Sequence, residues 1–228
     1  MKKKVIVISL GGSVIIPNEI NVRFLKEFKK TILKNTKKNK FIIVCGGGSI
    51  ARKYIYALRE INADTKLQSF AGISTTRMNA RFMNYFFKIN PEKGIPHTEK
   101  ELRKYIEKQD VIFCGALDYH PNQTSDSTSA EIARMFKSDF INITNVNGLH
   151  DKNPLVYKNA KFIPKISWRD FEKMANKIKF EPGQHFVLDQ RAAGEILKNK
   201  TTTYIIGSSP KQLDNIIKNK KFFGTIIN

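Results

Sequence analysis

The chain has little of several features that would each direct it to a particular class of protein. Its 228 residues include only two cysteines, which each end an apolar run and form no CxxC pair, so neither a disulfide scaffold nor a cysteine metal centre is indicated. No apolar run approaches the ~20 residues of a membrane-spanning helix. The apolar run 5–10 is too short for a signal peptide and is followed by two glycines. We therefore expect reduced thiols, a cytoplasmic protein and no membrane span.

Acidic residues are also scarce: the chain has 20 Asp and Glu but 40 Lys and Arg, which gives a formal net charge of +20. The lysines are spread over segments of helical period, and the sequence has no RRM-type aromatic motif and no Cys/His finger spacing. This pattern favours a solvated basic surface that attracts anionic substrates over a specific nucleic-acid partner. The motif GxxxxGK[ST] is absent too, which argues against a P-loop nucleotide-binding protein.

The sequence does contain short, β-branched apolar runs that alternate with longer segments of helical period. This alternation predicts an α/β protein, a three-layer αβα sandwich around a mostly parallel sheet. Expected strands cover 4–9, 40–45, 111–114, 140–144 and 202–206. Expected helices cover 22–35, 49–61, 69–87, 99–107, 127–136, 168–176, 190–198 and 210–218. No repeat or linker divides the chain, so residues 1–228 are predicted to form one domain.

Two glycine loops follow two of the predicted strands. Gly11–Ser13 follows the first, and Gly46–Ser49 follows the second and opens a helix that carries Arg52 in its first turn. A helix N-terminus without side chains in the way offers free N–H groups to an anion, so the pair predicts a phosphate-binding crevice. The second loop also satisfies GxGxxG/A, which keeps a dinucleotide-binding fold open as a rival.

Two further polar loops follow later strands. The loop 115–126 ends with Thr124 and Asp126 at a helix start, and Asn147-Gly148 forms a turn soon after strand 140–144. His120 in the first of these loops lacks a second nitrogen or sulfur ligand, so we expect no metal held by the protein alone. The carboxyl ends of parallel strands share one edge of a sheet, so all four loops are predicted to meet there.

Taken in order, these elements resemble the amino acid kinase family, and most closely its archaeal uridylate kinase branch. The resemblance covers nearly the whole chain, on the two glycine loops, Gly46–Ile55, Thr76–Ala80, His120-Pro121 with Thr124–Asp126, Ile143–Gly148, and Leu188-Asp189 with Ala192-Ala193. It implies transfer of a phosphoryl group from ATP to UMP with Mg²⁺, and a homo-oligomer, which in uridylate kinases is often a hexamer. It also implies that the N-terminal part binds the acceptor and the C-terminal part binds ATP.

The same resemblance assigns roles to individual positions. It implies catalytic roles for Lys165, Asp126 and Arg52, with Lys165 as the main cation on the transferred group. The positions implied for ATP are Gly12, Ser13, Gly48, Arg52, Thr144, Asn145, His150 and Asn153. The positions implied for the acceptor are Gly47, Ser69, His120 and Thr124.

Several positions depart from the family pattern. Ser9 stands where many relatives have a lysine, and Ser69 stands where uridylate kinases have an acid for the acceptor ribose. His150 and Asn153 replace an aromatic and an acid, Asn147 replaces an acid, and the loop around Asp118 is lengthened. Two alternatives therefore stay open: a sister kinase of the same fold that acts on another small phosphate or carboxylate, and a nucleotide-binding protein without turnover.

Overall fold

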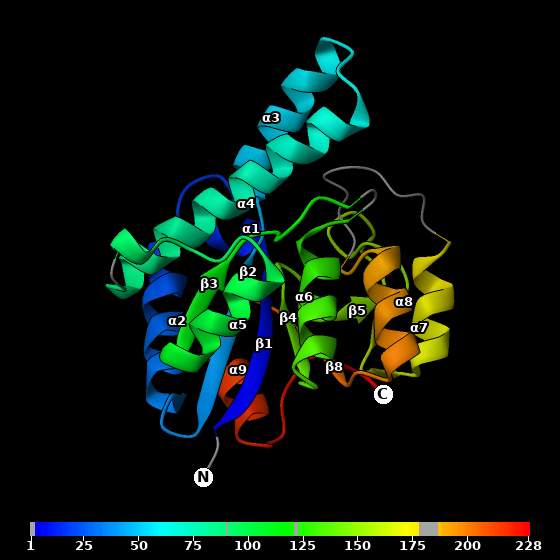
Figure 1. The fold of residues 1–228 in the computed structure, drawn as a ribbon. Helices are drawn as coiled ribbons and strands as arrows, with labels where there is room; N and C mark the ends of the chain where they lie inside the picture. The colour runs from blue at the N-terminus through cyan, green and yellow to red at the C-terminus, as the bar shows by residue number, and fades with distance from the viewer. Residues whose placement is uncertain (1–2, 90, 121–122, 178–186) are drawn as a thin grey trace.

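The central sheet of the computed structural model has seven strands in the order β3-β2-β1-β4-β8-β9-β7 (Figure 1). The structure describes residues 3–89, 91–120, 123–177 and 187–228. The strands of this sheet are β1 (Lys4–Leu10), β2 (Asn39–Cys45), β3 (Val111–Cys114), β4 (Phe140–Ile143), β7 (Lys165–Ile166), β8 (Thr203–Ile206) and β9 (Thr225–Ile227). The five strands that the sequence predicts, β1 to β4 and β8, are parallel, whereas β9 is antiparallel to β8. A separate hairpin pairs β5 (Leu149–His150) with β6 (Phe162–Ile163).

Helices cover both faces of the sheet, which confirms the predicted three-layer αβα architecture. The helices are α1 (Gly12–Ile15), α2 (Val22–Asn35), α3 (Gly48–Glu60), α4 (Thr65–Phe87), the 3-10 turn η1 (Pro91–Lys93), α5 (Glu99–Lys108), α6 (Ser125–Met135), α7 (Trp168–Ala175), α8 (Gln190–Asn199) and α9 (Pro210–Ile217). Side chains of α2, α4 and α9 form the core on one face, and those of α5 to α8 form the core on the other. In the described part of the chain, no helix combines the length and the apolar composition that crossing a membrane requires.

The alternation of side chains along β1 feeds both cores. Ile6, Ile8 and Leu10 belong to the core under α2 and α4, whereas Val7 belongs to the core under α6 and α8. A strand that is buried on both faces is apolar throughout, which explains why the run reads as continuous in the sequence. Ser9 shares the face of Val7 and is fully buried. A polar side chain in that place needs a hydrogen-bond partner.

Three helix starts carry side-chain caps. Thr98, Ser167 and Ser209 each accept a hydrogen bond from a backbone N–H three residues further on, and Thr98 forms a full capping box with Glu101. Each cap satisfies a donor that a helix start leaves unpaired.

Two features of the topology place the candidate site. The order of the strands reverses between β1 and β4, and ligands of open α/β sheets bind at the carboxyl ends of the strands beside such a switch point. In addition, α3 and α4 form a long helical arm (residues 48–87). Helix α3 and the first half of α4 project from this end of the sheet, whereas the last turns of α4 pack on the core through Ala80, Met83 and Phe87 (Figure 1).

Candidate active site

A cavity of about 590 Å³ lies at the carboxyl ends of the parallel strands. Its wall includes residues from all four loops that the sequence singled out: Gly11–Ser13, Gly46–Gly48, Gln123–Asp126 and the segment from Thr144 to Leu155. The cavity is large enough for a nucleotide-sized ligand. The predicted convergence of the four loops is therefore confirmed.

The two glycine loops press against each other at the floor of the cavity. A Cβ atom at Gly12 would lie 1.9 Å from the backbone nitrogen of Gly48, and one at Gly46 would lie 2.4 Å from the nitrogen of Gly12. Gly48 has a φ of +69°, in the left-handed region that favours glycine. Only glycine allows the two backbones to approach this closely, so the glycines are required by packing as well as by any ligand.

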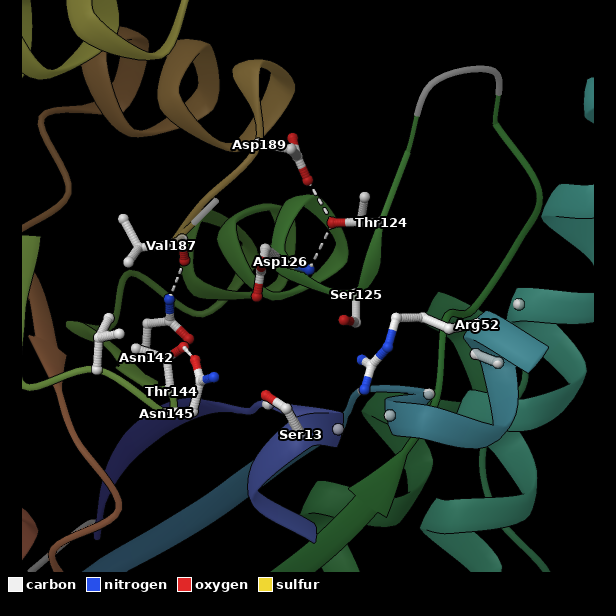
Figure 2. Close-up of a pocket in the computed structure, with 18 of the residues that line it drawn as sticks. Ser13, Arg52, Thr124, Ser125, Asp126, Asn142, Thr144, Asn145, Val187 and Asp189 are labelled. Atoms are coloured by element: carbon white, nitrogen blue, oxygen red, sulfur yellow. Dashed lines mark hydrogen bonds between the residues drawn. The ribbon is translucent and has the colours of Figure 1, made fainter. Parts of the chain in front are cut away.

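The second glycine loop presents unpaired N–H groups at the start of α3. Within the described residues, the N–H groups of Gly47 and Gly48 donate to no acceptor, while the flanking Gly46 and Ser49 donate to Leu10 and Ile16. Arg52 extends into the cavity from one turn inside α3, and its guanidinium faces Ser13 and Ser125 (Figure 2). Partial burial lowers the pKa of Arg52 from its ordinary value, but a guanidinium keeps its charge in proteins. N–H groups and a cation at one helix start suit a phosphate.

Asp126 lies at the opposite wall, in the first turn of α6, and its carboxylate accepts a 2.7 Å hydrogen bond from the hydroxyl of Ser9. Burial, and secondly the negative charge of Asp189, raise the pKa of Asp126 to about 7, against the stabilising effect of the Ser9 hydroxyl. The other oxygen, Oδ2, accepts no hydrogen bond from the described part of the chain. The ionised form of Asp126 is thus disfavoured in the free protein, and a cation that arrives with the ligand would stabilise it.

Asp189 ties the starts of α6 and α8 together (Figure 2). Its Oδ1 accepts from the N–H of Ala192 at 2.7 Å, and its Oδ2 accepts from the hydroxyls of Ser127, at 2.7 Å, and Thr124. Thr124 in turn accepts from the N–H of Asp126 at 3.1 Å. Both oxygens of Asp189 therefore accept hydrogen bonds, and the residue holds the loop that carries Asp126.

The remaining wall of the cavity follows β4. Thr144 and Asn145 directly follow that strand, and His150 and Asn153 come from β5 and the turn beyond it. The ring of His150 packs 5.5 Å from that of Phe162, which stacks on Phe223 at 5.1 Å. This half of the cavity is lined by a few polar side chains beside packed aromatic rings, a combination that suits a nucleoside.

The chain matches the model of the "Amino acid kinase family" over residues 4–207. The chain belongs to the amino acid kinase family. It is 32% identical over 217 residues to the uridylate kinase of Pyrococcus abyssi, covering 94% of this chain and 96% of that protein. It is 30% identical over 227 residues to the uridylate kinase of Thermococcus kodakarensis, covering 97% and 98%.

Solved structures agree with this family membership. The structure of uridylate kinase from Archaeoglobus fulgidus superposes with a TM-score of 0.81 at 32% identity, covering 99% of this chain and 100% of that one. The UMP kinase of Ureaplasma parvum, 23% identical, shares the fold with a TM-score of 0.79 over 100% of each chain. Membership of the amino acid kinase family accounts for both glycine loops. The alternative of a dinucleotide-binding fold, which the motif GxGxxG/A had kept open, is therefore excluded.

The cavity brings together most of the positions that the family resemblance singled out. Those that line it are Gly12, Ser13, Gly47, Gly48, Arg52, Ser69, Thr124, Asp126, Thr144, Asn145, His150 and Asn153. Two positions lie elsewhere. Lys165 is exposed on the edge strand β7, and His120 borders a separate small hollow beside α6. Neither lines this cavity, and their roles in an amino acid kinase stay predictions.

Sequence reasoning gave no site role to several other residues of this wall. Lys152 and Lys177 add cations to it, and Asn142 on β4 donates to the carbonyl of Val187 (Figure 2). Asp189 belongs to the positions that carry the family resemblance, but the sequence predicted no role for it. Its signal was the cap position before α8, which by itself indicates a helix start and no more.

The hydrogen bond from Ser9 leads to a test on the pH dependence of this amino acid kinase. The hydroxyl favours the ionised form of Asp126, so Ser9→Ala should raise the pKa of Asp126 further. We expect the acid limb of kcat/KM, which reports the free enzyme, to move upward by roughly one pH unit. Rates measured from pH 5 to 9 check this, with Ser129→Ala, a buried serine further along α6 and outside the cavity, as the control. An acid limb at the wild-type pH would contradict the coupling.

The two candidate cations, Arg52 and Lys165, can be compared directly. Arg52 points into the cavity, whereas Lys165 is exposed outside it. We expect Arg52→Met to lower kcat/KM by ~10²-fold, as the loss of a charge stabiliser does. Lys165→Met should lower it less than Arg52→Met does. Steady-state kinetics of the two variants decide the order, and a larger loss at Lys165 would contradict it.

Proposed function

We propose that this amino acid kinase transfers the γ-phosphoryl group of ATP to UMP, giving ADP and UDP. The observation that carries the proposal is the pair of glycine loops in one cavity, with the unpaired N–H groups of Gly47 and Gly48 opposite Asp126. End-to-end similarity to proteins named uridylate kinase supports UMP as the acceptor.

We further propose that residues 1–228 act as one kinase domain with two halves. The acceptor binds beside the arm, near Gly47 and Ser69, and ATP binds beside β4, near Thr144 and His150. The cavity runs between these two groups of residues, so the two phosphate ends meet over the glycine loops. The Ser69 hydroxyl donates to the carbonyl of Thr65, which leaves its oxygen able to accept from a ribose hydroxyl.

The same residues fit Mg²⁺ delivered with ATP. Mg²⁺ is usually held by one or two carboxylates together with substrate phosphates. Asp126 offers one oxygen that no described residue engages, whereas both oxygens of Asp189 are occupied. Bound Mg²⁺ supplies positive charge on the phosphate oxygens, and Asp126 is the side chain that would hold it.

The reaction this geometry supports needs no nucleophile from the protein. The acceptor phosphate oxygen attacks the γ-phosphorus and the bond to the β-γ bridging oxygen breaks, so one phosphoryl group moves and ADP leaves. The chain contributes position and charge. Gly47 and Gly48 supply N–H groups, and Arg52 supplies a cation between the two halves of the cavity.

The helical arm supports the proposal of a homo-oligomer. Large apolar side chains exposed on this arm are Tyr54, Tyr56, Ile61, Leu67, Phe70, Met78 and Tyr85. Such a concentration marks an interaction surface. We expect sedimentation velocity to show a homo-oligomer, such as a hexamer. Tyr56→Lys should weaken it, whereas Leu33→Lys, at an exposed apolar site on α2, should leave it intact. A monomeric wild type would contradict the proposed oligomer but not the proposed reaction.

We propose the cytoplasm as the compartment of this protein. The thiols Cys45 and Cys114 are buried and free, which suits a reducing compartment.

An acceptor panel tests the proposed function. ADP release from Mg-ATP should depend on the acceptor, with the highest kcat/KM for UMP, and should be near background without one. CMP, AMP and small organic phosphates serve as competitors. A higher kcat/KM for an organic phosphate would favour the sister kinase, and no ADP with any acceptor would favour a binding protein.

A further inference from the structure

The glycine loop between β2 and α3 is held from outside the cavity by one buried side chain. Asn79 of α4 is 5% exposed, and its Nδ2 donates to the carbonyl of Gly46 at 2.7 Å and to that of Gly47 at 3.2 Å. Asn79 does not line the cavity, so it acts on a ligand only through this loop.

Fixing these two carbonyls also fixes two N–H groups. In a planar trans peptide the N–H points opposite to the C=O, so the carbonyls of Gly46 and Gly47 set the directions of the N–H groups of Gly47 and Gly48. Both point away from Asn79, and neither has an acceptor in the described part of the chain. Glycine peptides rotate easily. Among the described residues only Asn79 donates to the Gly46 carbonyl, whereas the Gly47 carbonyl also accepts a longer hydrogen bond, of 3.4 Å, from the N–H of Ala51. Without the amide, the Gly46–Gly47 plane therefore loses its hydrogen bond and the Gly47–Gly48 plane keeps only the longer one.

The same part of α4 also holds the loop that follows β3. The N–H of Ala116 donates to Thr76 Oγ1 at 3.0 Å, and Arg77 Nε donates to the carbonyl of Ala116 at 3.1 Å. The segment Thr76–Ala80, which is part of the family resemblance, thus holds two walls of the cavity. Asn79 holds the glycine loop, and Thr76 and Arg77 hold the loop after β3.

We propose that Asn79 is the positioning residue for phosphate in this enzyme, which sets the N–H groups of Gly47 and Gly48 toward the transferred group. The effect on catalysis rests on the proposed function. The effect on the orientation of the two N–H groups does not depend on it. The ligand class is a phosphate oxygen of either substrate.

Two variants and one matched control separate positioning from folding. Asn79→Asp replaces the donor with a carboxylate against two carbonyls, and Asn79→Ala removes the donor without adding charge. Asn84→Asp is the control, because Asn84 is also 5% exposed on α4 and donates to a glycine carbonyl, that of Gly94 at 3.0 Å, outside the cavity. A small displacement of a catalytic group costs up to ~10²-fold, so we expect kcat for UMP to fall ~10-fold to ~10²-fold at Asn79 and less than ~3-fold in the control.

A readout that needs no turnover uses protein labelled with glycine that carries both ¹³C-carbonyl and ¹⁵N. Only peptides between two glycines give a correlated signal, and in this sequence these are the amides of Gly12, Gly47 and Gly48. In the ligand-free protein the Gly47 and Gly48 signals should shift in both Asn79 variants and stay in place in the Asn84→Asp control. Their response to added ADP should be reduced at Asn79 as well.

The outcomes decide the proposal separately from the function. Unmoved Gly47 and Gly48 signals with kcat within ~3-fold of wild type would overturn it, as would equal losses at Asn79 and Asn84. If the wild type forms no UDP, the proposed function fails, and the glycine signals with and without ADP still decide whether Asn79 positions the loop. If Asn79→Asp does not fold, Asn79→Ala carries the same comparison.

Discussion

The Asp126→Asn variant should lose ~10²-fold in kcat, or roughly 3 kcal/mol of transition-state stabilisation, and yet be more stable than the wild type. The loss of activity follows because the amide no longer carries the charge that would hold Mg²⁺ beside the phosphates. The gain in stability follows because Asp126 is a carboxylate held in a half-buried place near a second carboxylate, that of Asp189, and both effects raise its pKa. Replacing a residue that served the fold alone would instead lower the stability.

The pH dependence gives the sign of the stability change. The pKa of Asp126 is raised from its ordinary value to about 7 in the folded protein. Its cost to the free energy of unfolding therefore starts above the unfolded pKa of ~4, grows as the pH rises, and is complete above the folded pKa of ~7. We expect Asp126→Asn to raise the free energy of unfolding by roughly 1–3 kcal/mol at pH 8 and by less at pH 5.

Urea unfolding at the two pH values checks this, together with kcat at saturating substrates. Glu195→Gln on α8 is a suitable control, because that carboxylate lies outside the cavity in an ion pair with Arg134. Equal stability changes at pH 5 and pH 8 would contradict the raised pKa, and wild-type kcat would contradict the role of Asp126.

The second large effect concerns Gly48, where alanine should abolish most nucleotide binding. A Cβ there would lie 2.6 Å from the carbonyl oxygen of Gly12 and 2.6 Å from a methyl carbon of Ile16, in a residue with φ +69°. Either the two glycine loops separate or the start of α3 changes conformation, and in both cases the N–H groups leave their positions. We expect KM for both substrates to rise by ~10-fold or more and kcat to fall as well.

Two other glycines isolate the causes. Gly94→Ala has the same backbone strain, with a φ of +67°, but its Cβ meets nothing within 4 Å. Gly194→Ala lies within α8 with open space around it, and alanine there favours the helix. Calorimetric titration with ADP should show weakened binding for Gly48→Ala alone. Comparable weakening in Gly94→Ala would mean that general destabilisation, and not the contact between the loops, causes the effect.

The sequence predicted those parts of the fold that depend on local patterns. Strand β3 and helix α2 occupy the predicted residues 111–114 and 22–35, because continuous apolar runs and capped helical periods are set by neighbours in the chain. The prediction missed β5, β6, β7 and β9. Strands of two or three residues have no periodicity to detect, and their pairing, such as Lys165 with Ile226, joins distant segments.

The same distinction applies to the site. Glycine loops and cap residues predicted the floor of the cavity, because parallel strands bring their carboxyl ends to one edge. The roles of Asn79 and Asp189 could not be predicted, since each depends on partners far along the chain: Gly46 for Asn79, and Thr124 for Asp189. Ser9 is a similar case, because a missing lysine says nothing of the hydrogen bond that the serine makes with Asp126.

The most direct test of the account follows the phosphoryl group itself by ³¹P NMR of wild-type enzyme with Mg-ATP and UMP. We predict that UDP and ADP accumulate in equal amounts, with no inorganic phosphate beyond the background, and that both form much more slowly when Gly48→Ala replaces the wild type under the same conditions. ATP that stays intact, or that is converted to ADP and inorganic phosphate while UMP is unchanged, would contradict the claim that this cavity transfers a phosphoryl group from ATP to UMP.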